Sequence, residues 1–220
     1  MIENSMKKLL LGKERSAIED ALRMLAEDIL KHYILKVGDT LISIAEIEMY
    51  YFHKDYYENN VTYKFDKDYY KTEQAFVHPS GFDVRLPLST EDYYTRFLVR
   101  AAKVGLDSET TCGPLNVRKA IDQLGVNLNT ATLQLIPQYV ETTEKVYFAT
   151  RKGIGDTATD ADKEAMLSAA ITNGGTLHIE GKEKYATCEL KRRNIHNQEA
   201  ADELSKEIIG YKVPGIKEFY

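Results

Sequence analysis

The chain has 220 residues, of which 43% are hydrophobic and 29% charged, and this composition supports one buried core with a small appendage. Its formal net charge of −5 argues against tight nonspecific binding to nucleic acid, because contact with phosphates favours a basic surface. The sequence holds no run of about 18 apolar residues, so we expect no membrane span.

Cysteine and histidine usage points away from disulfides and metals. Cys112 and Cys188 are too few and too far apart to indicate a disulfide framework, and the five histidines lack metal-ligand spacing. The first residues carry two lysines and a short apolar run followed at once by charges, which does not fit a secretory signal peptide. We therefore expect a cytoplasmic protein with no metal and no cofactor.

The first part of the chain shows the pattern of one helix followed by two strands and a long loop. Apolar residues recur at helical spacing over residues 13–33, which predicts an amphipathic helix packed on a sheet. Strands are expected at about 34–37 and 40–52, joined by a Gly-Asp turn. Residues 50–70, with seven of the fifteen tyrosines, are expected to form a long loop. Such a loop suits ligand stacking, a protein interface or plain loop packing.

The second strand ends in polar residues. Side chains alternate along a strand, so Glu46, Glu48 and Tyr50 should share one face with Ile42 and Ile44. The opposite face is predicted to pack into the core, and it holds Leu41, Ala45, Ile47 and Met49. Burying two carboxylates is costly unless partners or a cleft receive them, and the simpler alternative is an edge strand whose end is wet.

A second polar block follows a Pro-Ser-Gly turn. Asp83 and Arg85 should share one strand face while the residues between them pack, and Arg100 ends a further strand at about 95–101. A hairpin across residues 89–94 would bring these groups toward Glu48. Two simpler interpretations remain open: His78 bonds the turn backbone instead of a ligand, and Asp83 and Arg85 form only a salt bridge.

The remaining pattern predicts a helix at about 115–124 and short strands at 133–136 and 145–149. Together these elements favour an α+β fold with a curved, mostly antiparallel sheet flanked by helices. Residues 1–155 would form this core and residues 156–220 an extension packed on it. The extension is expected to contain a helix at 160–170, a hairpin at 176–190 and a helix at 198–209.

Five short blocks follow one another over roughly residues 22–155. They are Glu46-Ile-Glu-Met-Tyr50, the turn-and-strand block 78–85, Phe97-Leu-Val-Arg-Ala101, Gly113-Pro-Leu115 and Arg151-Lys-Gly-Ile154. Their order and approximate spacing resemble the alkyladenine (3-methyladenine) DNA glycosylase family. The resemblance implies that family's α+β core, and hydrolysis of the N-glycosidic bond of a damaged or modified purine in DNA.

Carried over by position, the resemblance makes Glu48 the catalytic carboxylate and Arg100 the arginine that positions the attacking water. Tyr50 would stack on the flipped base, since such a base must be held against an aromatic face. Leu88 is the nearest candidate for the side chain that wedges the duplex.

The sequence departs from the family pattern where a second aromatic should stack on the base. Arg85 and Asp83 stand near that position and would give polar recognition of the base edge, aided by His78. The wedge hairpin is also shorter, and the chain has no tryptophan. A second hypothesis is therefore a noncatalytic binding module of the same fold for a nucleobase-like or other small ligand. A third is a protein-interaction surface on the tyrosine-rich loop.

Overall fold

The computed structural model describes residues 2–11, 15–53, 75–90, 93–105, 109–138, 146–149 and 166–171. Three helices and nine strands lie in these ranges. The helices are α1 (Ile2–Leu11), α2 (Arg15–His32) and α3 (Pro114–Gln123). The strands are β1 (Tyr33–Val37), β2 (Thr40–His53), β3 (Phe76–His78), β4 (Gly81–Arg85), β5 (Tyr93–Val104), β6 (Thr110–Cys112), β7 (Leu133–Pro137), β8 (Val146–Ala149) and β9 (Met166–Ile171).

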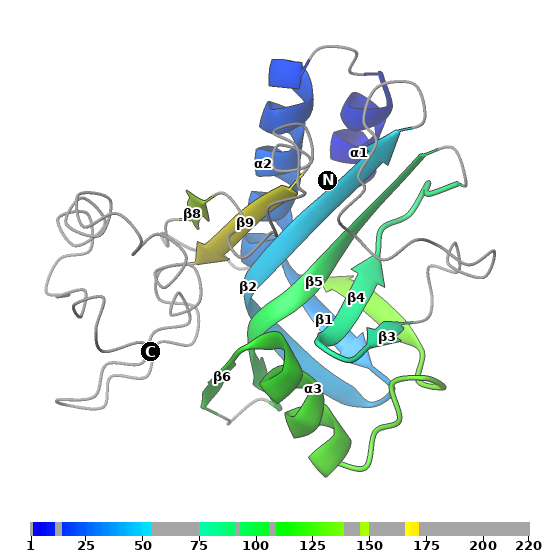
Figure 1. Cartoon of the computed structure of the whole chain (residues 1–220), viewed down its shortest axis with the longest axis vertical. Coiled ribbons are helices and arrows are strands. Elements are labelled where there is room, and N and C mark those ends of the chain that lie inside the picture. Colours follow the sequence, from blue (N-terminus) through cyan, green and yellow to red (C-terminus); the bar gives the residue numbers. More distant parts are fainter. Residues whose placement is uncertain are drawn as a thin grey trace, which may run out of the picture.

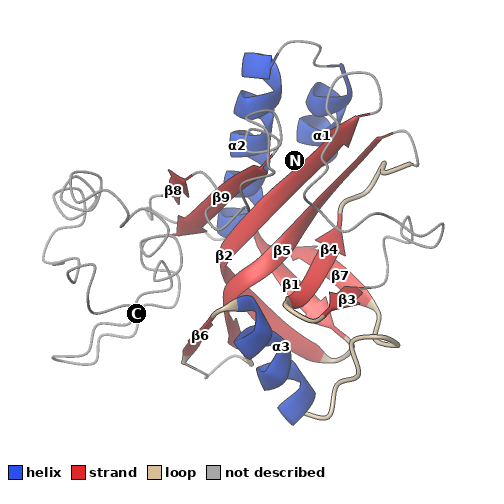
Figure 2. Cartoon of the chain, in the orientation of Figure 1, coloured by secondary structure: helices blue, strands red, loops and turns tan. Residues whose placement is uncertain are grey.

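All described strands belong to one antiparallel sheet, built around the long pair β2 and β5 (Figure 1). The first half of β2 pairs with β1 and its second half with β9. On the other side of the pair, β5 receives β4 along its first half and β6 along its second. The sheet thus forks on both sides of the central pair, and it curls as it does so (Figure 2). The α+β class with a curved antiparallel sheet is confirmed.

The helices lie at two places on this sheet. α1 and α2 pack side by side, and their apolar residues join one core with those of the central strands (Figure 1). The Tyr51 hydroxyl ties α1 to β2 by donating to the Leu9 carbonyl at 3.2 Å. At the other end, α3 lies against β4, β5 and β6, and its Val117 and Ile121 are buried.

Helix α2 and strands β1 and β2 follow the sequence prediction within about two residues, the usual uncertainty of element ends, whereas α1 was not predicted. The predicted helix at 160–170 is wrong over residues 166–170, which belong to strand β9 (Met166–Ile171). A short apolar run fits either element, and here pairing with β2 decides. The predicted tyrosine-rich loop is also wrong at its start, because β2 continues through His53.

Other parts of the prediction lie outside the described residues: most of the tyrosine-rich loop (54–70), the block 151–154, and the hairpin and helix expected at 176–190 and 198–209. Leu124 follows the last turn of α3 and is 55% exposed, unlike the buried Val117 and Ile121 of that helix. Within the described residues, none of the helices has both the length and the apolar character needed to cross a membrane.

Candidate functional site

Two irregularities in the central strand pair create the site. Ala45 on β2 and Arg100 on β5 have no residue opposite them. Each strand therefore carries one extra residue, and the two extra residues lie on either side of the Glu46–Ala101 pair. The pairs that flank them are Ile44 with Ala102, Glu46 with Ala101 and Ile47 with Val99. Such bulges bend the strand and re-aim side chains, and they recur beside functional sites.

The bulges exchange the two faces of β2. Residues opposite each other in an antiparallel pair point the same way, and Ala102 and Ala101 are neighbours that point in opposite ways. Ile44 therefore lies on the opposite face from Glu46. The assignment of Ile42 and Ile44 to the polar face is wrong: both are buried in the apolar core together with Ile47 and Met49. A strict alternation of faces cannot anticipate an inserted residue.

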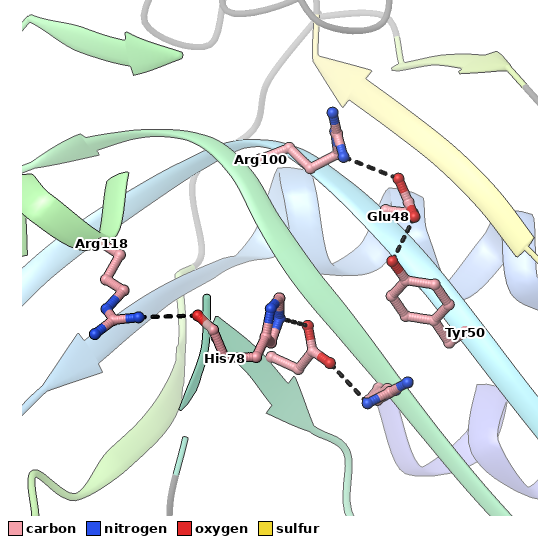
Figure 3. A network of polar contacts seen from close by, with 7 residues as sticks. Glu48, Tyr50, His78, Arg100 and Arg118 are labelled. Atoms are coloured by element: carbon pink, nitrogen blue, oxygen red, sulfur yellow. Dashed lines mark hydrogen bonds and ion pairs between the residues drawn. The ribbon is translucent and has the colours of Figure 1, made fainter. Parts of the chain in front are cut away.

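Arg100 holds two carboxylates of β2. Its Nη1 donates to Glu48 Oε2 at 3.0 Å, and its Nε lies 3.4 Å from Glu46 Oε1. The Tyr50 hydroxyl donates to the other Glu48 oxygen, Oε1 (Figure 3). Glu46 and Glu48 are fully buried and Arg100 is 8% exposed. The wet-edge interpretation of this strand end is therefore wrong, and the three residues assigned to catalysis and stacking are in direct contact.

A second cluster lies on β3, β4 and β5. Asp83 Oδ2 forms an ion pair with Arg96 Nη1 at 2.7 Å, and His78 Nε2 lies 3.3 Å from Asp83 Oδ1. Arg118 on α3 donates to the His78 carbonyl at 2.9 Å (Figure 3). His78, Asp83 and Arg96 are all buried. The His78 ring thus lies against a carboxylate side chain, and that carboxylate also forms an ion pair with Arg96.

Arg96 joins the two clusters. Its guanidinium carbon lies 4.8 Å from the centroid of the Tyr50 ring, at the distance of a cation–π contact. Arg96 and Tyr50 are register partners on β5 and β2, which places their side chains together on one face. Arg96 was not among the site residues predicted from the sequence. Its spacing of four from Arg100 on a strand was the available signal.

Arg85 lies beside Arg96 at the outer part of the same face, because these residues are opposite each other on β4 and β5. Burial lowers the pKa of Arg85 to about 10, and the nearby Asp83 carboxylate offsets only part of this effect. Arg85 and Asp83 are two residues apart on β4, so they share a strand face as predicted.

Leu88 lies apart from these clusters, in the turn after β4, and it differs from them in being 45% exposed. Its backbone has a φ of 65°, which is uncommon for a residue with a branched side chain. Ser89 fixes this turn, since its hydroxyl donates to the Leu86 carbonyl at 2.8 Å and accepts from the Thr95 amide at 3.3 Å. An apolar side chain is thus displayed on a strained but well-anchored turn.

The polar face offers acid–base and hydrogen-bonding chemistry. A carboxylate held by a guanidinium stays ionised and oriented, so Glu48 could accept a proton or a donor from a ligand. Among the described residues, no three His, Cys, Asp or Glu side chains are grouped so that they could hold a metal ion.

No protein-family model, no curated protein and no solved structure matches this chain. Any function must therefore be argued from the residues of the polar face and of the turn beside it.

Proposed function

We propose that this chain is a DNA glycosylase that hydrolyses the N-glycosidic bond of a damaged or modified purine, on a core of the alkyladenine glycosylase type. One observation carries the proposal. Glu48, Tyr50 and Arg100 were assigned catalytic and stacking roles by sequence resemblance alone, and they lie in direct contact although Arg100 is 52 residues from Glu48. The double bulge that brings them together has no evident purpose in a plain sheet.

In this reaction Glu48 acts as the general base. It takes a proton from a water molecule whose oxygen attacks C1′ of the sugar, while the bond from C1′ to the purine nitrogen breaks and the base leaves with the electron pair. Arg100 keeps the carboxylate ionised and aims it. Because Tyr50 holds Glu48 Oε1, its hydroxyl must withdraw to admit the water, and the ring then serves as the stacking surface.

Leu88 supplies an independent argument for DNA as the partner. Extruding a base from a duplex leaves a gap in the stack, and apolar side chains such as leucine wedge into base steps. An exposed leucine on a strained, anchored turn suits this role. Backbone strain of this kind costs about 1–3 kcal/mol and gathers at functional sites.

A second function is favoured by how closely the site is filled. Both Glu48 oxygens are engaged, the carboxylates are fully buried, and Arg96 covers a face of the Tyr50 ring. A noncatalytic module that binds a nucleobase-like or other small ligand would need no water beside Glu48. The two functions share the site and differ in whether a bond breaks.

Base release decides between them. Duplex oligonucleotides that carry one methylated or deaminated purine are incubated with the wild type, with Glu48→Gln and with the control Glu109→Gln, which changes an exposed glutamate. We expect release by the wild type and the control, and a loss of about 10²–10⁴-fold in Glu48→Gln, the usual contribution of a general base. Equal release by all three proteins rules out Glu48 as the base. Binding of the lesion duplex or free base without release favours the binding module.

A further inference from the structure

The orientation of the Tyr50 side chain has two parts: the position of its hydroxyl and the plane of its ring. The hydroxyl donates to Glu48 Oε1, and this bond fixes its position. The hydroxyl lies on the axis about which the ring turns, so the bond hardly restrains the plane, and rotation about this torsion is broad in tyrosine. A contact on the face of the ring is the kind that sets its plane.

Arg96 makes such a contact. Its guanidinium carbon lies 4.8 Å from the centroid of the Tyr50 ring, and the two residues are opposite each other on β5 and β2. A guanidinium is flat and is attracted to the face of an aromatic ring rather than to its edge. Turning the Tyr50 ring about its own axis would present an edge to Arg96 and break this contact.

Asp83 in turn fixes Arg96. An arginine side chain has many rotamers, so a loosely held one would restrain its neighbour little. Here Asp83 Oδ2 forms an ion pair with Arg96 Nη1 at 2.7 Å, and the two residues are 2% and 1% exposed. A contact between ionised groups holds a guanidinium more firmly than a neutral hydrogen bond does. The plane of the Tyr50 ring on β2 thus depends on a carboxylate of β4.

We propose that Arg96 is a positioning residue, which sets the plane of the Tyr50 ring and is itself fixed by Asp83. Arg96 acts on the reaction only through Tyr50, by keeping the stacking surface in one orientation. The inference rests on the proposed function for the stacking role of Tyr50. The restraint on the ring is a property of the fold, and it can be measured separately from any reaction.

The rate at which the Tyr50 ring flips measures this restraint. With carbon-13 at the two Cε positions of tyrosine, NMR exchange spectra report the flip rate, and the Tyr50 signals are those absent from Tyr50→Phe. In Arg96→Lys the charge remains but the flat guanidinium is lost, so the flip rate of Tyr50 should rise at least ~10-fold. Asp83→Asn keeps the shape of the side chain but loses its charge, so the rate should rise in this variant too.

Tyr51 is the matched control within the same molecule. It is fully buried on the opposite face of β2, and its hydroxyl also makes a hydrogen bond, to the Leu9 carbonyl. Its flip rate should stay unchanged in both variants. An unchanged rate at Tyr50 in Arg96→Lys overturns the proposal, and so does an equal rise at Tyr51, because Arg96 would then only support the fold. An unchanged rate in Asp83→Asn alone refutes the part assigned to Asp83.

Base release separates this inference from the proposed function. In a protein that keeps Tyr50, Arg96→Lys should lower kcat/KM by about tenfold, and in the Tyr50→Leu background it should have no further effect, because no ring is left to orient. The exposed-lysine control Lys119→Gln should change neither the flip rate nor base release. An equal loss in both backgrounds overturns the proposal, since Arg96 would then act other than through Tyr50. Faster flips of Tyr50 in Arg96→Lys, with no base release by the wild type, refute only the glycosylase.

Discussion

The central strand pair has two faces that are equally buried and chemically opposite. On one face Ile47, Met49 and Phe97 are fully buried in the apolar core, and on the other Glu46 and Glu48 are fully buried beside Arg100. Burial of the first face stabilises the fold roughly in proportion to the apolar area removed from water. Burial of the polar face adds little to the stability of the fold, because desolvation of the charges offsets their attraction. We infer that the polar face is retained for what it binds.

The largest expected effect comes from removing the shared cation of the polar face. Arg100→Met leaves Glu46 and Glu48 buried without their guanidinium, and we expect a loss of about 3–5 kcal/mol in the free energy of unfolding, measured by urea denaturation. Lys103→Met on the same strand is the control, because this lysine is only partly buried and its loss should change stability by about 0.5 kcal/mol or less.

A loss in Arg100→Met no greater than that of the control would contradict the comparison. It would mean that the two carboxylates are stabilised by other groups and that the ion pairs contribute little to the polar face.

Much of the polar face could be predicted from local sequence. Alternation along a strand places Asp83 with Arg85, and Glu46 with Glu48 and Tyr50, and the structure keeps both groupings. The two bulges could not be predicted in this way, because an unpaired residue is defined by the partner strand and not by its own neighbours. The assignment of Ile42 and Ile44 was wrong for this reason.

Two other features also depend on distant segments. The apolar run at 166–171 is compatible with a helix or a strand, and only the unpaired edge of β2 selects the strand. The role of Arg96 follows from two groups that lie far from it in sequence, Asp83 and the Tyr50 ring. Pairing partners, rather than residue types, therefore limited the prediction.

The next largest effect on stability is expected where β4 packs against the start of α3. Gly81 has a φ of 153°, and a Cβ added there would lie 2.9 Å from Pro114 Cβ and 3.1 Å from Leu98 Cδ1. Gly81→Ala should therefore force α3 away from β4 and cost about 1–3 kcal/mol, as overpacking does. Gly38→Ala is the control: it also has positive φ, at +57°, but nothing lies within 4 Å of its added Cβ.

Because only backbone strain acts at Gly38, its substitution should cost about 1 kcal/mol. Equal losses of unfolding free energy for the two variants would show that φ alone explains Gly81, and that the start of α3 is not held closely against the polar face.

The smallest effect on stability is expected at Leu88, where it should accompany a large effect on function. Glycine adopts the observed φ of 65° without strain, so Leu88→Gly should gain up to about 1 kcal/mol, whereas Leu88→Ala keeps the strain and should gain little. Leu124→Gly is the control: this leucine is also exposed, but its φ of −82° leaves no such strain to relieve.

If Leu88 wedges the duplex, both Leu88 variants should release the lesion base more slowly, and Leu124→Gly should not. Unchanged release in both Leu88 variants would separate the strained turn from DNA, and leave the buried polar face as the only support for the glycosylase.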